Sequence, residues 1–163
     1  MPDSPRRPSP APSGARPDDT LPAPARILGP AGLIPFAALC VAALVWPEWR
    51  FAALVLLVTY GALIASFLGG VHWGLALRPR PGEEWAAWPR LALGVLPSLI
   101  AWAALFLLPR AGSLVAIAAL LLATAGIETL ATRRGLMPPA YLRLRWFLSG
   151  GAAGFLLLAA TVA

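Results

Sequence analysis

The sequence predicts an all-α membrane protein, a bundle of five transmembrane helices without a large soluble domain. The 163-residue chain is 59% hydrophobic and 12% charged, and its mean hydropathy is +0.74. A soluble domain of this size cannot hide so much apolar surface, whereas several bilayer crossings expose it to lipid. The apolar residues also form separate runs, each long enough to cross a hydrocarbon core of about 30 Å.

Polar or proline-containing segments divide these runs, and we expect the spans at about 28–46, 51–77, 91–108, 113–130 and 144–163. The tight turns 47–50 and 109–112 join neighbouring spans into antiparallel hairpins. Pro35 and Pro97 lie inside the first and third spans, where a proline removes one backbone donor and predicts a kink.

Residues 1–26 are rich in proline, serine and alanine, and such a segment cannot bury a core. We expect a disordered cytoplasmic tail here and a transmembrane domain over 27–163. The tail does not resemble a secretory signal, because the apolar stretch begins late and no small-residue cleavage site follows it. Three aspartates and many prolines also make it a poor mitochondrial transit peptide.

The second span is the element around which we expect the others to pack. At 100° per residue, Gly61 and Ala65 share a face with His72, while Ser66 and Gly70 lie roughly opposite. Small residues spaced by four let helices approach closely in lipid, so we predict protein neighbours on both sides of this helix. The expected packing positions are Gly61, Ala65, Ser66, Gly69, Gly70 and Gly74.

The arginines predict the orientation. Eleven of them fall in the tail, in the second loop and around the last loop, against Arg50 and Arg110 in the other turns. The positive-inside rule then places the amino terminus in the cytoplasm and the carboxyl terminus outside. Lysine, asparagine and glutamine are absent, which is typical of a GC-rich bacterial gene; we expect a bacterial inner membrane, with the mitochondrial inner membrane as the alternative.

The basic residues flank apolar runs rather than forming one basic face, so the pI of about 11.3 does not indicate a nucleic-acid partner. The partner that composition indicates is the lipid bilayer. Near the start of the fifth span we predict interface anchors, and their arginines can also contact anionic lipid headgroups on the cytoplasmic side. These residues are Tyr141, Arg143, Arg145 and Trp146.

Two ionisable residues lie within the spans at similar expected depth, the single histidine His72 and Glu128. Such groups are costly in lipid and usually face the protein interior with a partner. One interpretation makes them a binding or proton-handling pair, with Ser98 and Trp73 as further members of the site. In the other, His72 bonds a carbonyl freed by a proline, while Glu128 reaches the arginines of the last loop and locks the bundle.

Ordinary catalytic and metal-binding patterns are missing from the sequence. One histidine and one cysteine, Cys40, cannot build a usual zinc site, and no glycine-rich phosphate loop is present. We therefore expect no metal or cofactor. A constant offset of 62 residues relates the tetrapeptides 32–35 and 94–97 and the prolines Pro47 and Pro109, which suggests that the two hairpins arose by duplication.

Several segments resemble the transmembrane-protein-69-like family, a domain of unknown function found in bacteria and mitochondria. They are 28–36, 60–77, 96–98 and 141–145, and the string Ser-Phe-Leu-Gly-Gly-x-His-Trp-Gly at 66–74 is the most specific. The chain departs from the family pattern at Pro138-Pro139-Ala140-Tyr141 and carries Glu128 where the family typically has aspartate. The resemblance implies a small polytopic inner-membrane protein and supplies no activity.

The leading functional hypothesis is a non-catalytic accessory or assembly component that acts through helix packing, as a homo-oligomer or with other membrane proteins. The alternative is a carrier that binds a small solute, a proton or a lipid at His72 and Glu128. An intramembrane enzyme is the third. A water-accessible cavity reaching His72 would favour the carrier, whereas tightly packed glycine faces without a cavity would favour the accessory role.

Overall fold

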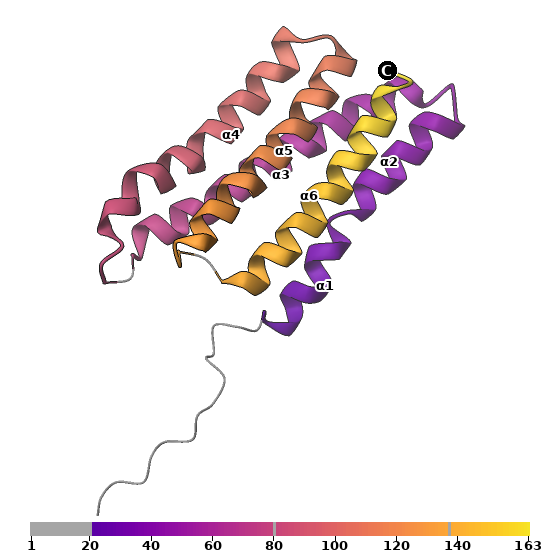
Figure 1. Cartoon of the computed structure of the whole chain (residues 1–163). Coiled ribbons are helices and arrows are strands. Elements are labelled where there is room, and N and C mark those ends of the chain that lie inside the picture. Colours follow the sequence, from indigo (N-terminus) through magenta and orange to yellow (C-terminus); the bar gives the residue numbers. More distant parts are fainter. Residues whose placement is uncertain (1–20, 80, 137) are drawn as a thin grey trace, which may run out of the picture.

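A computed structural model describes residues 21–79, 81–136 and 138–163 as helices and the turns between them (Figure 1). Five helical segments are long and apolar enough to cross a membrane, which confirms the predicted fold class. The first segment is interrupted and the third begins with a short 3₁₀ turn. The elements are α1 (Ala23–Ala31), α2 (Ile34–Val45), α3 (Arg50–Leu77), η2 (Glu84–Ala86), α4 (Ala87–Leu107), α5 (Arg110–Arg133) and α6 (Pro139–Ala160).

All five segments begin earlier in the chain than expected, and three of them do so by five residues or more. The first starts at Ala23, the third at Glu84 and the last at Pro139. Prolines at the start of α1 and α6 explain two of these differences, because a proline fits the first helical turn without losing a bond. The expectation of a disordered tail falls mostly on residues 1–20, outside the described residues.

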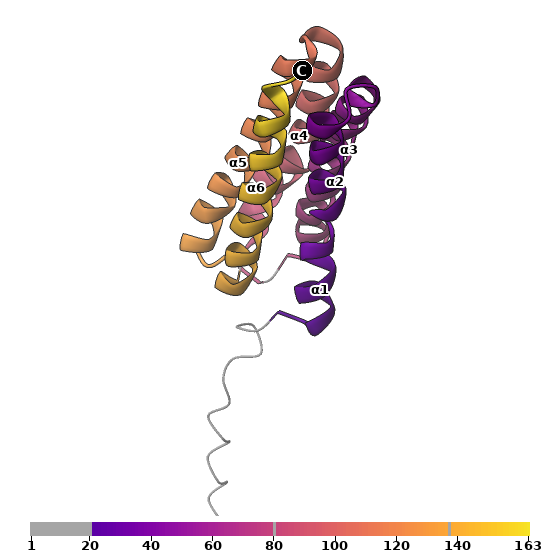
Figure 2. The ribbon, with the colours of Figure 1, turned by 90° about the vertical axis from the view of Figure 1, so that its right-hand side faces the viewer.

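The helices run roughly antiparallel, so that α1 and the carboxyl terminus lie at opposite ends of the bundle (Figure 1). Turned by 90°, α5 and α6 lie on one side and α2 and α3 on the other (Figure 2). Helix α4 packs against α3 and α5, and α2 packs against α3 and α6. Helix α3 contacts α2, α4, α5 and α6, so it has the central position that its small residues predicted.

Burial follows the pattern of a protein solvated by lipid. The core mixes leucines such as Leu57 and Leu121 with many alanines, whereas Phe67, Trp88 and Leu107 are each at least 70% exposed. In water such a surface would cause aggregation, but lipid tails solvate it without penalty. The apolar outer surface is therefore a second, independent indication that the bundle lies in a bilayer.

The first segment breaks at Gly32 and Leu33, two to three residues before the predicted kink at Pro35. Pro35 lies in the first turn of α2, where its missing N–H removes no helical bond. The Tyr60 hydroxyl donates to the Gly32 carbonyl at 3.0 Å and so satisfies the backbone at the break. Pro97 lies inside α4, which continues through it as one helix.

Only one of the two predicted small-residue faces of α3 is packed within the chain. Gly61, Ala65 and Gly69 are buried, and a Cβ at Gly69 would overlap the Gly94 carbonyl of α4. The opposite residues Ser66, Gly70 and Gly74 are exposed, and a Cβ at either glycine would meet nothing within 4 Å. Helix α3 is therefore central, but these three small residues face no other helix among the described residues.

Candidate functional site

A buried carboxylate joins three helices near the arginine-rich end of the bundle. Glu128 of α5 is only 1% exposed, and each of its oxygens has a different partner. Oε1 lies 3.0 Å from Nε2 of His72 on α3, and Oε2 accepts a hydrogen bond of 2.8 Å from Nε of Arg145 on α6. The two residues that the sequence singled out as ionisable are thus in direct contact.

His72, Glu128 and Arg145 form a row of ionisable side chains across the three helices. Arg145 therefore lies in the interior, whereas we expected it to be an interface anchor. It is 3% exposed, donates to the Thr124 hydroxyl at 2.7 Å, and also donates to the Ser149 hydroxyl. Arg145 is the seventh residue of α6, already two turns inside the helix, and its side chain faces α5 rather than the membrane surface. Burial of a carboxylate therefore explains burial of this arginine.

The other predicted anchors have mixed surroundings. Arg143 is exposed, and the half-exposed Trp146 donates from its indole N–H to the Thr129 hydroxyl at 2.9 Å. Tyr141 is partly buried, and its hydroxyl finds no hydrogen-bond partner among the described residues.

The electrostatics of the row favour a charge-balanced arrangement. Glu128 carries one negative charge and Arg145 one positive charge, so a neutral His72 leaves the row without net charge. A carboxylate only accepts hydrogen bonds, so Nε2 of His72 carries the proton between them. In this tautomer Nδ1 is an acceptor, and none of the described residues donates a hydrogen bond to it.

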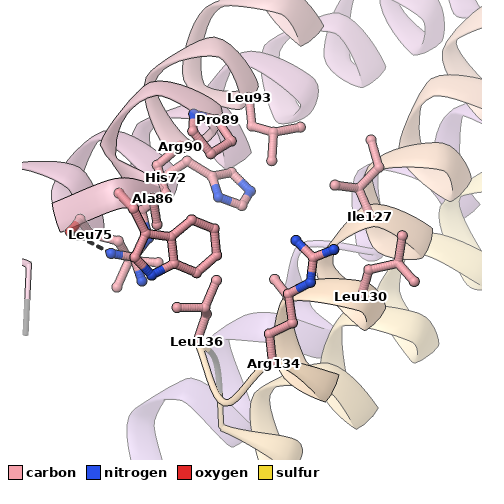
Figure 3. A pocket seen from close by; sticks show the side chains of 12 residues that line it. His72, Leu75, Ala86, Pro89, Arg90, Leu93, Ile127, Leu130, Arg134 and Leu136 are labelled. Carbon is pink, nitrogen blue, oxygen red and sulfur yellow. Dashed lines mark hydrogen bonds between the residues drawn. The ribbon is translucent and has the colours of Figure 1, made fainter. Parts of the chain in front are cut away.

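A cleft opens beside His72 between α3, α4 and α5, and we call it the His72 cleft. Its volume is about 170 Å³, and leucine, isoleucine and other apolar side chains form most of its lining. His72 and Arg134 point into it from opposite sides (Figure 3). Arg90 also lines it, but its guanidinium bonds Glu83 at 2.7 Å and the Leu75 carbonyl at 3.4 Å.

Ser98 and Trp73, the other predicted members of the site, lie apart from this row. The Ser98 hydroxyl donates to the Val95 carbonyl of its own helix at 2.7 Å. Trp73 is 42% exposed, and its indole lies against Gly94 of α4.

Sequence reasoning did not identify Arg134, Thr124 or Ser149 as members of the site, although part of the signal was present. Thr124 and Glu128 are four residues apart, as are Arg145 and Ser149, so each pair shares a helix face. Polar residues at this spacing inside apolar spans predict a buried network. The spacing does not predict which helices face each other, because that depends on the tertiary structure.

Residues 21–162 match the profile of a family described as protein of unknown function (DUF3429). The chain belongs to this family. A relative named transmembrane protein 69, from Xenopus tropicalis, is 44% identical to the chain over 88 residues, which are 52% of this chain and 33% of the relative. The alignment thus spans about a third of that protein, and no solved structure matches the chain.

Membership in the DUF3429 family confirms the resemblance that the sequence showed. The family description gives no activity, so the chemistry of the site has to be argued from its residues.

Proposed function

We propose that this DUF3429 protein binds a small amphipathic anion, a carboxylate with an apolar tail, in the His72 cleft. The observation that carries the proposal is the lining of the cleft: Arg134 and the His72 ring face each other across a mostly apolar space, and Arg90, the other charged side chain in the lining, is already bonded to Glu83 (Figure 3). Ligand sites commonly combine an apolar wall with a few convergent polar groups. A cavity that reaches His72 is also the feature that favours a carrier over an accessory protein.

The row behind His72 supports capture of an acid headgroup. A carboxylic acid entering the cleft transfers its proton to Nδ1 of His72 and becomes a carboxylate. The imidazolium then lies between two negative groups, the ligand carboxylate and Glu128, and Arg134 supplies a second positive charge. Charge-assisted hydrogen bonds of this kind are about twice as strong as neutral ones.

Binding of laurate to the full chain in lipid nanodiscs tests this proposal, with empty nanodiscs as the blank. We expect Arg134→Gln to weaken laurate binding about tenfold or more, the usual effect of losing a hydrogen bond to a charged group. Arg133→Gln is the matched control, because Arg133 is also exposed but does not line the cleft. Equal affinities of the two variants would contradict the proposal.

The affinity for laurate should fall as the pH rises. The complex of laurate anion with protonated His72 holds one proton more than the separated anion and neutral ring, so binding takes up a proton. The groups that surround the ring are Glu128, Arg90 and Arg134, and Arg145 lies behind Glu128. A pH series of laurate titrations checks this, and His72→Gln should remove the pH dependence.

A second candidate function, the accessory or assembly role, is supported by the open face of α3. Ser66, Gly70 and Gly74 are exposed small residues spaced by four, which is a common helix-pairing pattern in lipid. If a partner helix packs there, Gly70→Ile should abolish its co-purification in mild detergent, while the lipid-facing control Leu63→Ile should not. Retention of the partner by Gly70→Ile would exclude this surface.

We also propose that the amino terminus lies on the cytoplasmic or matrix side of an inner membrane, because the arginines gather at that end. A relative from a eukaryote fits the mitochondrial alternative.

A further inference from the structure

A second cleft lies on the other side of the buried row, and we call it the Arg145 cleft. It occupies about 160 Å³ between the α1–α2 break, α3 and α6. Apolar side chains such as Phe36, Ile64 and Leu148 and the glycines at the break line it. The polar side chains in its lining are Arg145 and Ser149.

Arg145 and Ser149 have donors that no described residue accepts from. A guanidinium has five N–H groups, and Glu128, Thr124 and Ser149 each take one from Arg145. The Ser149 hydroxyl accepts from Arg145, and its own O–H has no acceptor among the described residues. The carbonyl of Gly32 at the break already accepts from Tyr60. The cleft therefore offers donors to a ligand that accepts.

Charge distinguishes this cleft from the His72 cleft. Arg145 is already neutralised by Glu128 at 2.8 Å, so an anion placed here would meet no net positive charge. An anion would also lose its hydration in an apolar space, which is costly without a free counter-charge. A neutral acceptor such as a carbonyl oxygen avoids this penalty and can still accept from the guanidinium.

We propose that the Arg145 cleft binds a neutral amphiphile through its carbonyl oxygen, with the apolar body against the leucine and phenylalanine side chains. The carbonyl accepts from a spare N–H of Arg145 or from the Ser149 hydroxyl. The His72 cleft and the Arg145 cleft thus differ in selectivity: the first takes an anion and the second a neutral carbonyl, with Glu128 between His72 and Arg145.

The shared carboxylate links the clefts. A ligand carbonyl that accepts a hydrogen bond from the Arg145 guanidinium alters the bond between Arg145 and Glu128. Because Glu128 also accepts from His72, the change reaches the His72 ring. His72 is the single histidine in the chain, so selective ¹⁵N-histidine labelling yields signals from this ring alone.

Methyl laurate and laurate are matched probes, since they share a chain and differ in charge. With the full chain in nanodiscs, we expect Leu148→Trp to fill the Arg145 cleft and weaken methyl laurate binding at least tenfold. Leu93→Trp, which fills the His72 cleft, should leave methyl laurate binding unchanged and weaken laurate binding instead. Ser149→Ala should weaken methyl laurate about fivefold, the usual effect of losing one neutral hydrogen bond.

Methyl laurate should also shift the ¹⁵N signals of His72, and Leu148→Trp should abolish that shift. The proposal is overturned if methyl laurate does not bind, if Leu148→Trp leaves its affinity unchanged, or if laurate binds the Leu93→Trp variant more tightly than methyl laurate does. Laurate binding to wild type reports on the His72 cleft separately, so each proposal can fail alone. Dioctanoylglycerol and a decyl-substituted benzoquinone then distinguish a glycerolipid ester from a quinone. If neither compound binds, that result contradicts the proposal.

Discussion

At the scale of single residues, Glu128 is the group on which most of the site depends. Buried charges in lipid are tolerated when each has a partner and its remaining lone pairs are hydrogen-bonded. Glu128 satisfies both conditions, because Arg145 balances its charge and His72 binds its other oxygen. Removing either charge alone should therefore be much worse than removing both.

Glu128→Gln should lower the free energy of unfolding by about 3–5 kcal/mol, since it leaves Arg145 buried without a counter-charge. The combined change of Glu128→Leu with Arg145→Leu should recover most of that stability. Denaturant titration of the purified protein in mixed micelles measures both. Glu48→Gln is the control, and we expect a change of about 0.5 kcal/mol or less, because Glu48 is exposed in the turn between α2 and α3.

At the scale of elements, the two glycine positions Gly69 and Gly70 of α3 have opposite environments despite being adjacent. Gly69 meets the backbone of Gly94, which brings α3 and α4 closer than side chains would allow, whereas Gly70 faces open space. Adjacent residues lie 100° apart around a helix, so one can face a neighbouring helix while the next faces lipid.

Gly69→Ala should destabilise the bundle by about 1–3 kcal/mol, because the new methyl group meets rigid backbone and the helices must move apart. Gly70→Ala should be neutral or stabilising by up to about 1 kcal/mol, from the better helix propensity of alanine. Thermal unfolding of the two variants in one detergent compares them. A larger loss for Gly70→Ala would indicate that a partner covers the open face.

At the scale of the whole molecule, α1 and the end of α6 lie at opposite ends of the bundle, so the proposed orientation puts them on opposite sides of the membrane (Figure 1). The turns at 46–49 and 108–109 lie at one end, and the connections that follow α3 and α5 lie at the other (Figure 1). Two of the arginines behind the orientation argument, Arg90 and Arg145, are buried in ion pairs and do not act as free surface charges. The remaining nine still outnumber Arg50 and Arg110 on the other side.

Alkaline phosphatase fused after Ala163 should be active when the chain is expressed in a bacterial inner membrane, because the proposed orientation puts that end outside. The same enzyme fused after Gly82, between α3 and α4, should be inactive. Phosphatase activity normalised to the amount of fusion protein checks the pair. If the fusion after Gly82 were active and the one after Ala163 inactive, the proposed orientation would be wrong. The arginine count behind it would then have been misled by the buried arginines.

Composition and the length of the apolar runs alone determined the fold class, since lipid requires long uninterrupted helices and this requirement is local to each segment. The same reasoning placed His72 and Glu128 at one depth, because depth follows from position along a span. Tertiary structure alone decided that Arg145 faces Glu128, that Arg134 lines a cleft and that one glycine face of α3 stays open. These features depend on how each helix is rotated and which neighbour it meets. A span that is apolar on every side has no polar face to indicate how it is rotated. Its sequence therefore determines neither its rotation nor its neighbouring helix.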